Sequence, residues 1–150
     1  MKVVLQRVSE ANVQIDNTIH AKIDQGILVL LGIEESDTKE EADWLSAKIA
    51  GLRIFGDGEG KMNLAIQDIF GSFLVISQFT LHASTKKGNR PSYLRAARPE
   101  IAITLYEYFT TKLEEVSKCP VKTGIFGADM KVQLINDGPV TNIIDTKNKE

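Results

Sequence analysis

The first third of the chain alternates apolar and polar residues in short runs that are rich in β-branched side chains. These runs predict strands at Lys2–Val8, Ala11–Ile15, Thr18–Ile23 and Gly26–Ile33. The pair Asp16-Asn17, between the second and third runs, is typical of a tight turn. Because antiparallel strands can be joined by such short connections, we expect an antiparallel meander at the start of the fold.

Two later segments have the three-to-four-residue apolar spacing of amphipathic helices. The first begins at Asp37–Glu40, where an acidic cap is followed by a glutamate three residues later. The second begins at Pro99, because proline is favoured at the first helical position. The predicted buried faces consist of Ala42, Leu45, Ile49 and Trp44 in the first helix, and of Ile101, Leu105, Tyr108, Phe109, Val116 and the stem of Lys112 in the second.

The other apolar runs predict further strands, and Ser72–Ile76, the most apolar, is expected at the centre of the sheet. The remaining ones are Leu52–Phe55, Val121–Phe126, Met130–Asn136 and Val140–Ile144. Acidic residues in Gly56–Gly60 would repel phosphate, so we interpret this segment as a hairpin turn. The polar segment Thr146–Glu150 is expected to fray. The sum is an α+β fold, a largely antiparallel β-sheet or barrel with two main α-helices packed against it.

Composition indicates one ordinary globular domain. No repeat or linker divides the 150 residues, so we expect a single domain over residues 1–150. The start of the chain reaches charged residues too early for a signal peptide, and no apolar run approaches a membrane span, so no membrane partner is expected. The single cysteine, Cys119, cannot form an internal disulfide, which favours a reducing cytoplasm.

Basic residues gather in one segment although the net charge is −2. Five of them precede the next acidic residue, Glu100: Lys86, Lys87, Arg90, Arg95 and Arg98. Such a run is suited to contacts with a few phosphate groups. A solvated surface loop has the same composition, and both interpretations stay open.

Side chains that usually carry catalysis or bind metals are sparse. Neither His20 nor His82 has a cysteine, aspartate or glutamate at metal-ligand spacing, so no metal site is predicted. Ser77 lacks the Gly-x-Ser-x-Gly turn of hydrolases, and His82 follows it in an orientation unfavourable for a base. Asp129 and Asp137 are as typical of turns as of acid catalysis.

Four motifs occur in the order Ser77–Leu81 (SQFTL), Lys87–Ser92 (KGNRPS), Thr123–Met130 (TGIFGADM) and Asn136–Thr141 (NDGPVT). Together they resemble the D-aminoacyl-tRNA deacylase family, and the start of the chain, Met1–Ala11, is similar as well. The resemblance implies a homodimeric hydrolase without a cofactor. Its substrate would be the ester that joins a D-amino acid, or glycine, to the 3′-terminal adenosine of tRNA, and it would reject L-aminoacyl-tRNA.

The resemblance also implies a catalytic segment, formed by Ser77, Gln78, Phe79 and Thr80. The main-chain N–H groups of Phe79 and Thr80 are the expected oxyanion hole, where a fixed donor contributes roughly 3–4 kcal/mol. The Thr80 hydroxyl is not expected to be a nucleophile. Instead, the ribose hydroxyl beside the scissile bond is expected to orient or deprotonate water.

By the same resemblance, Gly138-Pro139 is a cis peptide that enters the partner subunit's pocket, with Arg7 as its brace. Carbonyl oxygens of this motif would accept hydrogen bonds from the substrate ammonium group, whereas the Cβ of an L-residue would collide with the motif. Glycine, which lacks a Cβ, should pass.

The resemblance also assigns contacts with the RNA. Phe126, Gly127, Ala128 and Met130 are expected at the terminal adenine, although Phe126 and Met130 are equally interpretable as core residues. Contacts with tRNA phosphates are expected from Lys86, Lys87 and Arg90.

Two other functions compete with this hypothesis. A non-catalytic dimeric module could bind RNA or a nucleotide through the basic segment, which predicts salt-sensitive binding without ester hydrolysis. A small-molecule esterase would use Ser77 and His82, and Ser77→Ala would stop it.

Overall fold

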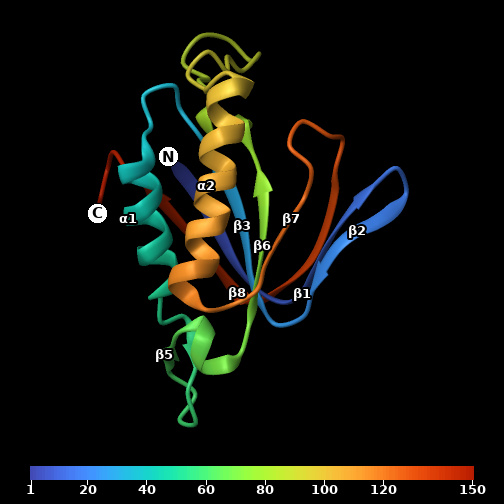
Figure 1. The fold of residues 1–150 in the computed structure, drawn as a ribbon, viewed down its shortest axis with the longest axis vertical. Coiled ribbons are helices and arrows are strands. Elements are labelled where there is room, and N and C mark those ends of the chain that lie inside the picture. Colours follow the sequence, from blue (N-terminus) through green and yellow to red (C-terminus); the bar gives the residue numbers. More distant parts are fainter.

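A computed structural model describes residues 1–150 as a curled β-sheet with two α-helices packed against one face (Figure 1). The helices are α1 (Lys39–Ala50) and α2 (Pro99–Ser117), with short 3-10 helices η1 (Ile66–Ile69) and η2 (Phe79–His82). The strands are β1 (Lys2–Ile15), β2 (Thr18–Ile23), β3 (Gly26–Gly32), β4 (Phe55–Gly56), β5 (Met62–Leu64), β6 (Ser72–Ser77), β7 (Val121–Thr123) and β8 (Lys131–Asp145). The predicted α+β class is confirmed.

The main sheet is mixed. Its order is β2-β1-β3-β6-β7, and β8 pairs with β1. All pairings of β1 are antiparallel, as predicted, whereas β3–β6 and β6–β7 are parallel. The parallel part follows from the positions of the helices, because α1 lies between β3 and β6 in sequence and α2 lies between β6 and β7.

Several predicted strand boundaries were wrong. Lys2–Val8 and Ala11–Ile15 form one continuous strand, β1, and the last two predicted strands merge into β8 across Gly138-Pro139. The strand predicted at Leu52–Phe55 shrinks to the two residues of β4. The predicted hairpin turn is confirmed, because β4 pairs with β5 across it.

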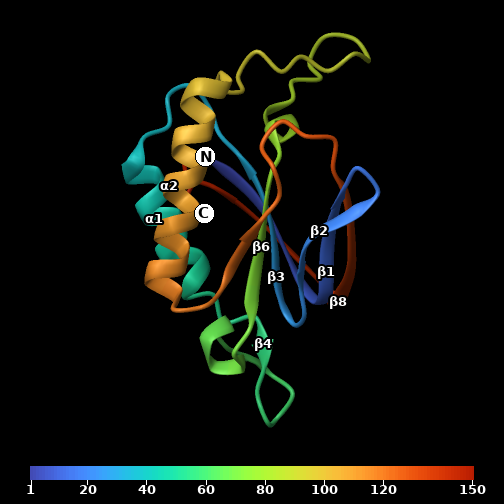
Figure 2. The same cartoon turned by 45° about the vertical axis from the view of Figure 1, so that its right-hand side comes forward.

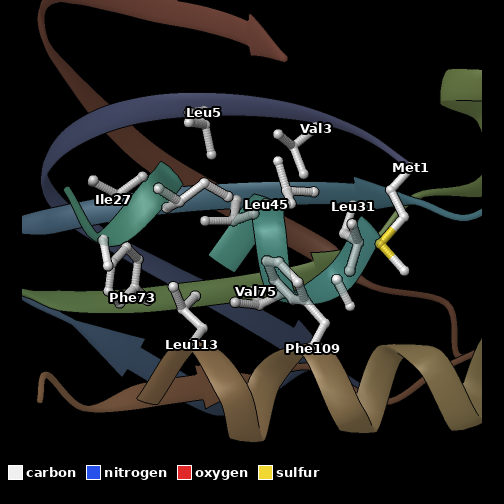
Figure 3. Packing of buried hydrophobic residues seen from close by; sticks show 14 of the residues in the cluster. Met1, Val3, Leu5, Ile27, Leu31, Leu45, Phe73, Val75, Phe109 and Leu113 are labelled. Atoms are coloured by element: carbon white, nitrogen blue, oxygen red, sulfur yellow. The ribbon is translucent and has the colours of Figure 1, made fainter. Parts of the chain in front are cut away.

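Side-chain alternation along the central strands builds a core on each face of the sheet. Ile27, Val29 and Leu31 of β3 face the helices, where Leu45 of α1 and Phe109 and Leu113 of α2 cover them (Figure 3). The intervening Leu28 faces the inside of the curl. There it joins a second cluster with Val8, Ala11, Val13, Ile23, Leu74 and Ile76. The curled sheet therefore has its own apolar interior beneath the helix layer.

The buried face of α2 differs in part from the prediction. Leu105 and Phe109 are buried as expected, but Tyr106 is buried in place of Tyr108. The Tyr106 hydroxyl donates a hydrogen bond to the Val75 carbonyl (2.7 Å), which satisfies its polar end inside the core. The other residues predicted on this face, Ile101, Tyr108, Lys112 and Val116, are half-buried.

The start of α1 and the two chain ends meet in a polar cluster. Thr38 caps α1, and Asp37, one residue earlier, accepts a hydrogen bond from the Met1 ammonium group (2.6 Å). That ammonium group also donates to the Thr146 hydroxyl (2.7 Å), and Thr146 is buried. Thr146, the first residue of the tail predicted to fray, is thus held in place, whereas Lys147–Glu150 are exposed. None of the helices is long and apolar enough to cross a membrane.

Candidate active site

A cavity of about 330 Å³ opens at the carboxyl end of β6. Its walls come from η2, the start of α2 and the β7–β8 connection, which lie side by side at one end of the sheet (Figure 2). Polar and loop residues at its rim are Ser77, Gln78, Phe79, Gly127, Ala128 and Asp129, and its apolar lining includes Leu31, Ile33, Ile76, Ala97, Ala102, Phe126, Met130 and Val132. The fold thus brings together two of the four motifs.

Two main-chain donors lie at this rim, in Phe79, and directly next to it, in Thr80. They are the first two residues of η2, so their N–H groups have no acceptor inside that helix, and they donate to no turn or loop carbonyl. The preceding N–H, that of Gln78, is held by the Leu31 carbonyl (2.8 Å), which ties the turn to β3. This geometry suits an oxyanion hole, because free donors in a fixed turn require no rearrangement to meet a developing charge. The role itself stays a prediction.

The Thr80 side chain contacts Gln78 within the same turn. Its hydroxyl accepts a hydrogen bond from the Gln78 side-chain amide (2.5 Å), and Thr80 is not among the residues that line the cavity. The pair links the two ends of the turn that carries Phe79. The sequence placed Gln78 in the catalytic segment, but it gave no sign of this contact.

Phe126 and Met130 line the cavity and also pack on the two cores. The Phe126 ring meets the Tyr106 ring edge to face, with centroids 6.0 Å apart. Between Phe126 and Met130, Gly127 takes φ of +79°, a conformation that side chains with a Cβ rarely adopt. The core interpretation of Phe126 and Met130 is therefore confirmed in part, and their contact with the terminal adenine stays a prediction.

His82 does not line the cavity. It is buried, it makes no hydrogen bond with Ser77, and its Nδ1 is 3.4 Å from a carboxylate oxygen of Glu34. Glu34 also pairs with Arg95. Burial acts to raise the pKa of Glu34, but the hydrogen bond from Arg95 and nearby positive charges outweigh it and hold that pKa below its usual range. This arrangement offers no base to Ser77.

The Gly138-Pro139 peptide is cis, as the resemblance implied. The register between β1 and β8 shifts on both sides of Val8, so that Arg7 alone stands opposite residues 137–140. Arg7 donates hydrogen bonds to the main-chain carbonyls of Asp137 (2.7 Å) and Ile54 (2.6 Å). The predicted contact between Arg7 and the motif is thus present.

Asn136 holds the other side of the same motif. Its side-chain oxygen accepts from the Val140 N–H (2.8 Å), and its amide donates to the Thr141 hydroxyl (3.0 Å). No separate role was predicted for Asn136, although an asparagine just before a turn is a recognised signal for such a bond. Gly138 and Pro139 are exposed between these two anchors.

Gly138-Pro139 lines a second, open hollow beside the β4–β5 hairpin. This hollow has a volume of about 500 Å³ and shares no residue with the cavity at η2. The structure therefore does not bring the fourth motif into the cavity of its own chain.

The basic segment is divided by the fold. Arg95 and Arg98 pair with Glu34 and Glu35, which arrive from the β3–α1 connection. Lys86, Lys87 and Arg90 are exposed in the loop before them and have no acidic partner. The acidic partners are distant in sequence from the basic segment. The sequence of that segment alone therefore could not show which of its basic residues form ion pairs. No cluster of three potential metal ligands is present.

Comparison with known proteins gives consistent matches. The family model described as D-Tyr-tRNA(Tyr) deacylase matches residues 4–145. Proteins named D-aminoacyl-tRNA deacylase from Flavobacterium psychrophilum and Bacteroides fragilis are 63% and 61% identical to this chain over 150 residues, which cover 100% of each chain compared.

Two solved structures share the fold. The structure of the c-Myc DNA Unwinding Element Binding Protein is 38% identical, with a TM-score of 0.90 over 97% of this chain and 98% of that one. A probable eukaryotic D-amino acid tRNA deacylase is 15% identical, with a TM-score of 0.81 over 95% and 97% of the two chains, and supports the fold alone.

Proposed function

The chain belongs to the D-aminoacyl-tRNA deacylase family, and on this premise we propose how it hydrolyses the ester of D-aminoacyl-tRNA. The observation that carries the proposal is the pair of N–H groups at the start of η2, that of Phe79 at the rim of an apolar cavity and that of Thr80 next to it, which have no acceptor within the helix. The ester carbonyl lies against these donors, which stabilise the oxyanion of the tetrahedral intermediate. Ser77 and Gln78 hold the turn in place.

The terminal adenosine occupies the cavity. Its adenine packs against Phe126 and Met130, and the loop main chain at Ala128 contacts the edge of the base. The adjacent ribose hydroxyl orients the attacking water, so that no side-chain nucleophile is needed. This fits the hydrogen bond that the Thr80 hydroxyl accepts from the Gln78 amide and the absence of His82 from the cavity lining.

The enzyme acts as a homodimer in which Gly138-Pro139 of each subunit enters the partner's cavity. Three observations support this arrangement. The motif is exposed and anchored by Arg7 and Asn136, it lies outside the cavity of its own chain, and Ile135 and Ile143 on the same strand are exposed apolar side chains. A second copy can supply both the missing wall and the cover for the apolar residues.

The inserted motif selects the handedness of the substrate. Its carbonyl oxygens accept hydrogen bonds from the substrate ammonium group, and the side chain of a D-residue points out of the cavity. The Cβ of an L-residue would meet the main chain of the motif, whereas glycine, with no Cβ, is accepted. Lys86, Lys87 and Arg90 contact tRNA phosphates outside the cavity. We also assign the enzyme to the cytoplasm, where aminoacyl-tRNA is used.

Loss of the ester bond from D-tyrosyl-tRNA and L-tyrosyl-tRNA tests the function. The purified protein should deacylate the D-ester far faster than buffer does and leave the L-ester at the buffer rate. Binding of both tRNAs without ester loss would favour the non-catalytic RNA-binding module instead.

A further inference from the structure

Two aromatic rings meet at the edge of the cavity. Phe79, which lines the cavity, packs edge to face against Tyr93, which does not, with ring centroids 5.2 Å apart and an angle of 77° between the planes. Both rings remain open to solvent, since Phe79 is 54% and Tyr93 38% exposed. The next residue, Leu94, is 95% exposed. An apolar surface made of Phe79, Tyr93 and Leu94, here named the rim platform, therefore borders the mouth of the cavity.

Main-chain hydrogen bonds fix the segment that follows Tyr93 and Leu94 to the residues after β3. The Ala97 N–H donates to the Ile33 carbonyl (2.9 Å), and Ala96 bridges to Glu34 at the end of β3. The Ala96 N–H in turn donates to the Tyr93 carbonyl (3.0 Å), which closes a turn beneath the ring. Aromatic rings on an anchored turn lose little conformational freedom when a ligand stacks on them.

Beyond the rim platform, the chain forms a loop that carries free positive charge. Ser84 and Ser92 exchange two main-chain hydrogen bonds (2.8 and 2.9 Å), which close the base of the loop. The loop extends past the end of the sheet in both views of the fold (Figures 1 and 2). Its unpaired cations are Lys86, Lys87 and Arg90. The order outward from the cavity is thus aromatic rim, then basic loop.

We propose that the rim platform binds the base of the nucleotide that precedes the terminal adenosine. The inference rests on the proposed function, since it takes the terminal adenosine to occupy the cavity. The 3′ end of tRNA is single-stranded, so the preceding cytidine leaves through the mouth with its base unpaired. Stacking of such a base on an aromatic side chain contributes about 1–3 kcal/mol. The phosphates that follow then meet the basic loop.

Charge favours RNA over a second copy of the chain on this surface. The loop next to the rim platform carries only positive side chains, those of Lys86, Lys87 and Arg90. If two copies of the chain met at this surface through the same residues, these like charges would face one another and repel. An apolar patch that leads into a cationic loop matches the alternation of bases and phosphates along a single strand.

Two substrates and two variants test the proposal. D-tyrosyl-adenosine, with the amino acid on its 3′ oxygen, fills the cavity only, and D-tyrosyl-CCA trinucleotide adds the two cytidines. Tyr93→Ala should raise KM roughly tenfold for the trinucleotide, by the loss of one stacking contact, and leave KM for the adenosine ester unchanged. Tyr93→Phe, which keeps the ring, should behave as the wild type on both.

Equal changes on the two substrates would contradict the proposal, as would an unchanged KM for the trinucleotide. A shift of the sedimentation coefficient in Tyr93→Ala would assign the surface to a second copy instead. Failure of the proposed function is a separate outcome, because the unsubstituted protein would then hydrolyse neither D-ester.

Discussion

The Arg7 guanidinium donates to the main-chain carbonyl of Asp137, with 2.7 Å between Nε and the oxygen. Its Nη1 donates to the Ile54 carbonyl (2.6 Å), so one side chain ties the exposed Gly138-Pro139 motif to the chain before β4. Arg7 is thus a positioning residue for a motif that lies outside the cavity of its own chain.

Arg7→Ala should impair catalysis and selectivity together. Hydrogen bonds to charged groups contribute about 1.5–3 kcal/mol each, so we expect kcat/KM for D-tyrosyl-tRNA to fall by roughly 10- to 100-fold. The ratio of D- to L-ester hydrolysis should fall as well, which a purely structural role would not cause. Lys112→Ala, in a partly exposed ion pair on α2, is the matched control and should leave both values unchanged.

Thr80→Ala should retain deacylation within about tenfold of the wild-type rate, because its main-chain N–H remains and only the hydrogen bond donated by the Gln78 amide is lost. Ser77→Ala should likewise retain activity. Single-turnover rates with D-tyrosyl-tRNA measure both variants. An acyl-enzyme detected by mass spectrometry, absent in either variant, would establish covalent catalysis and refute the main-chain mechanism.

Asp37→Asn should destabilise the fold without touching the cavity. The Met1 ammonium group and the Asp37 carboxylate are both 0% exposed, and removing one partner of a buried ion pair costs about 3–5 kcal/mol. Urea unfolding at pH 7 gives the comparison, with Glu115→Gln on the exposed face of α2 as the control. A change below about 1 kcal/mol, the value typical of exposed pairs, would contradict the burial of this pair.

Glu34 should make stability depend on pH. Its pKa lies below the ordinary value of 4.5, so the folded protein binds this proton more weakly than the unfolded chain. The contribution is therefore complete above pH 4.5 and is lost as the pH falls through the lowered pKa. Relative to the wild type, Glu34→Gln should be less stable by about 1–3 kcal/mol at pH 7. That deficit should shrink at pH 3, and an equal deficit at both pH values would contradict the lowered pKa.

Local sequence patterns predicted most of the fold, because the alternation in β1 to β3 and the caps of the helices are local signals. The parallel pairing of β6 was missed, since pairing across α1 and α2 depends on tertiary packing. Tyr106 was missed for a similar reason. Its hydroxyl partner, the Val75 carbonyl, lies on a strand 31 residues away.

The sequence motifs named most residues of the candidate site. They did not show which of these residues lie close together in the folded chain. Phe79 and Phe126 were both named, but only the fold shows that they share one cavity. The pairing of Arg95 with Glu34 was invisible, because the partner lies 61 residues away. The rim platform was missed as well, since an isolated Tyr93 in a polar loop has no distinctive pattern.

Exchange of subunits between two inactive variants tests the central claim, that the motif of one subunit completes the cavity of the other. Ala128→Trp fills the cavity and leaves the motif intact. Gly138→Ala distorts the motif and leaves the cavity intact, because its Cβ would lie 2.8 Å from the Val140 nitrogen.

Each variant alone should lose deacylation of D-tyrosyl-tRNA. Mixed dimers would join the intact cavity of the Gly138→Ala subunit to the intact motif of the Ala128→Trp subunit. After subunit exchange at equal amounts, activity should recover to about a quarter of the wild-type value, since half of the dimers are mixed and each has one complete site. No recovery in dimers shown by native mass spectrometry to be mixed would contradict a motif that acts across the two-fold axis.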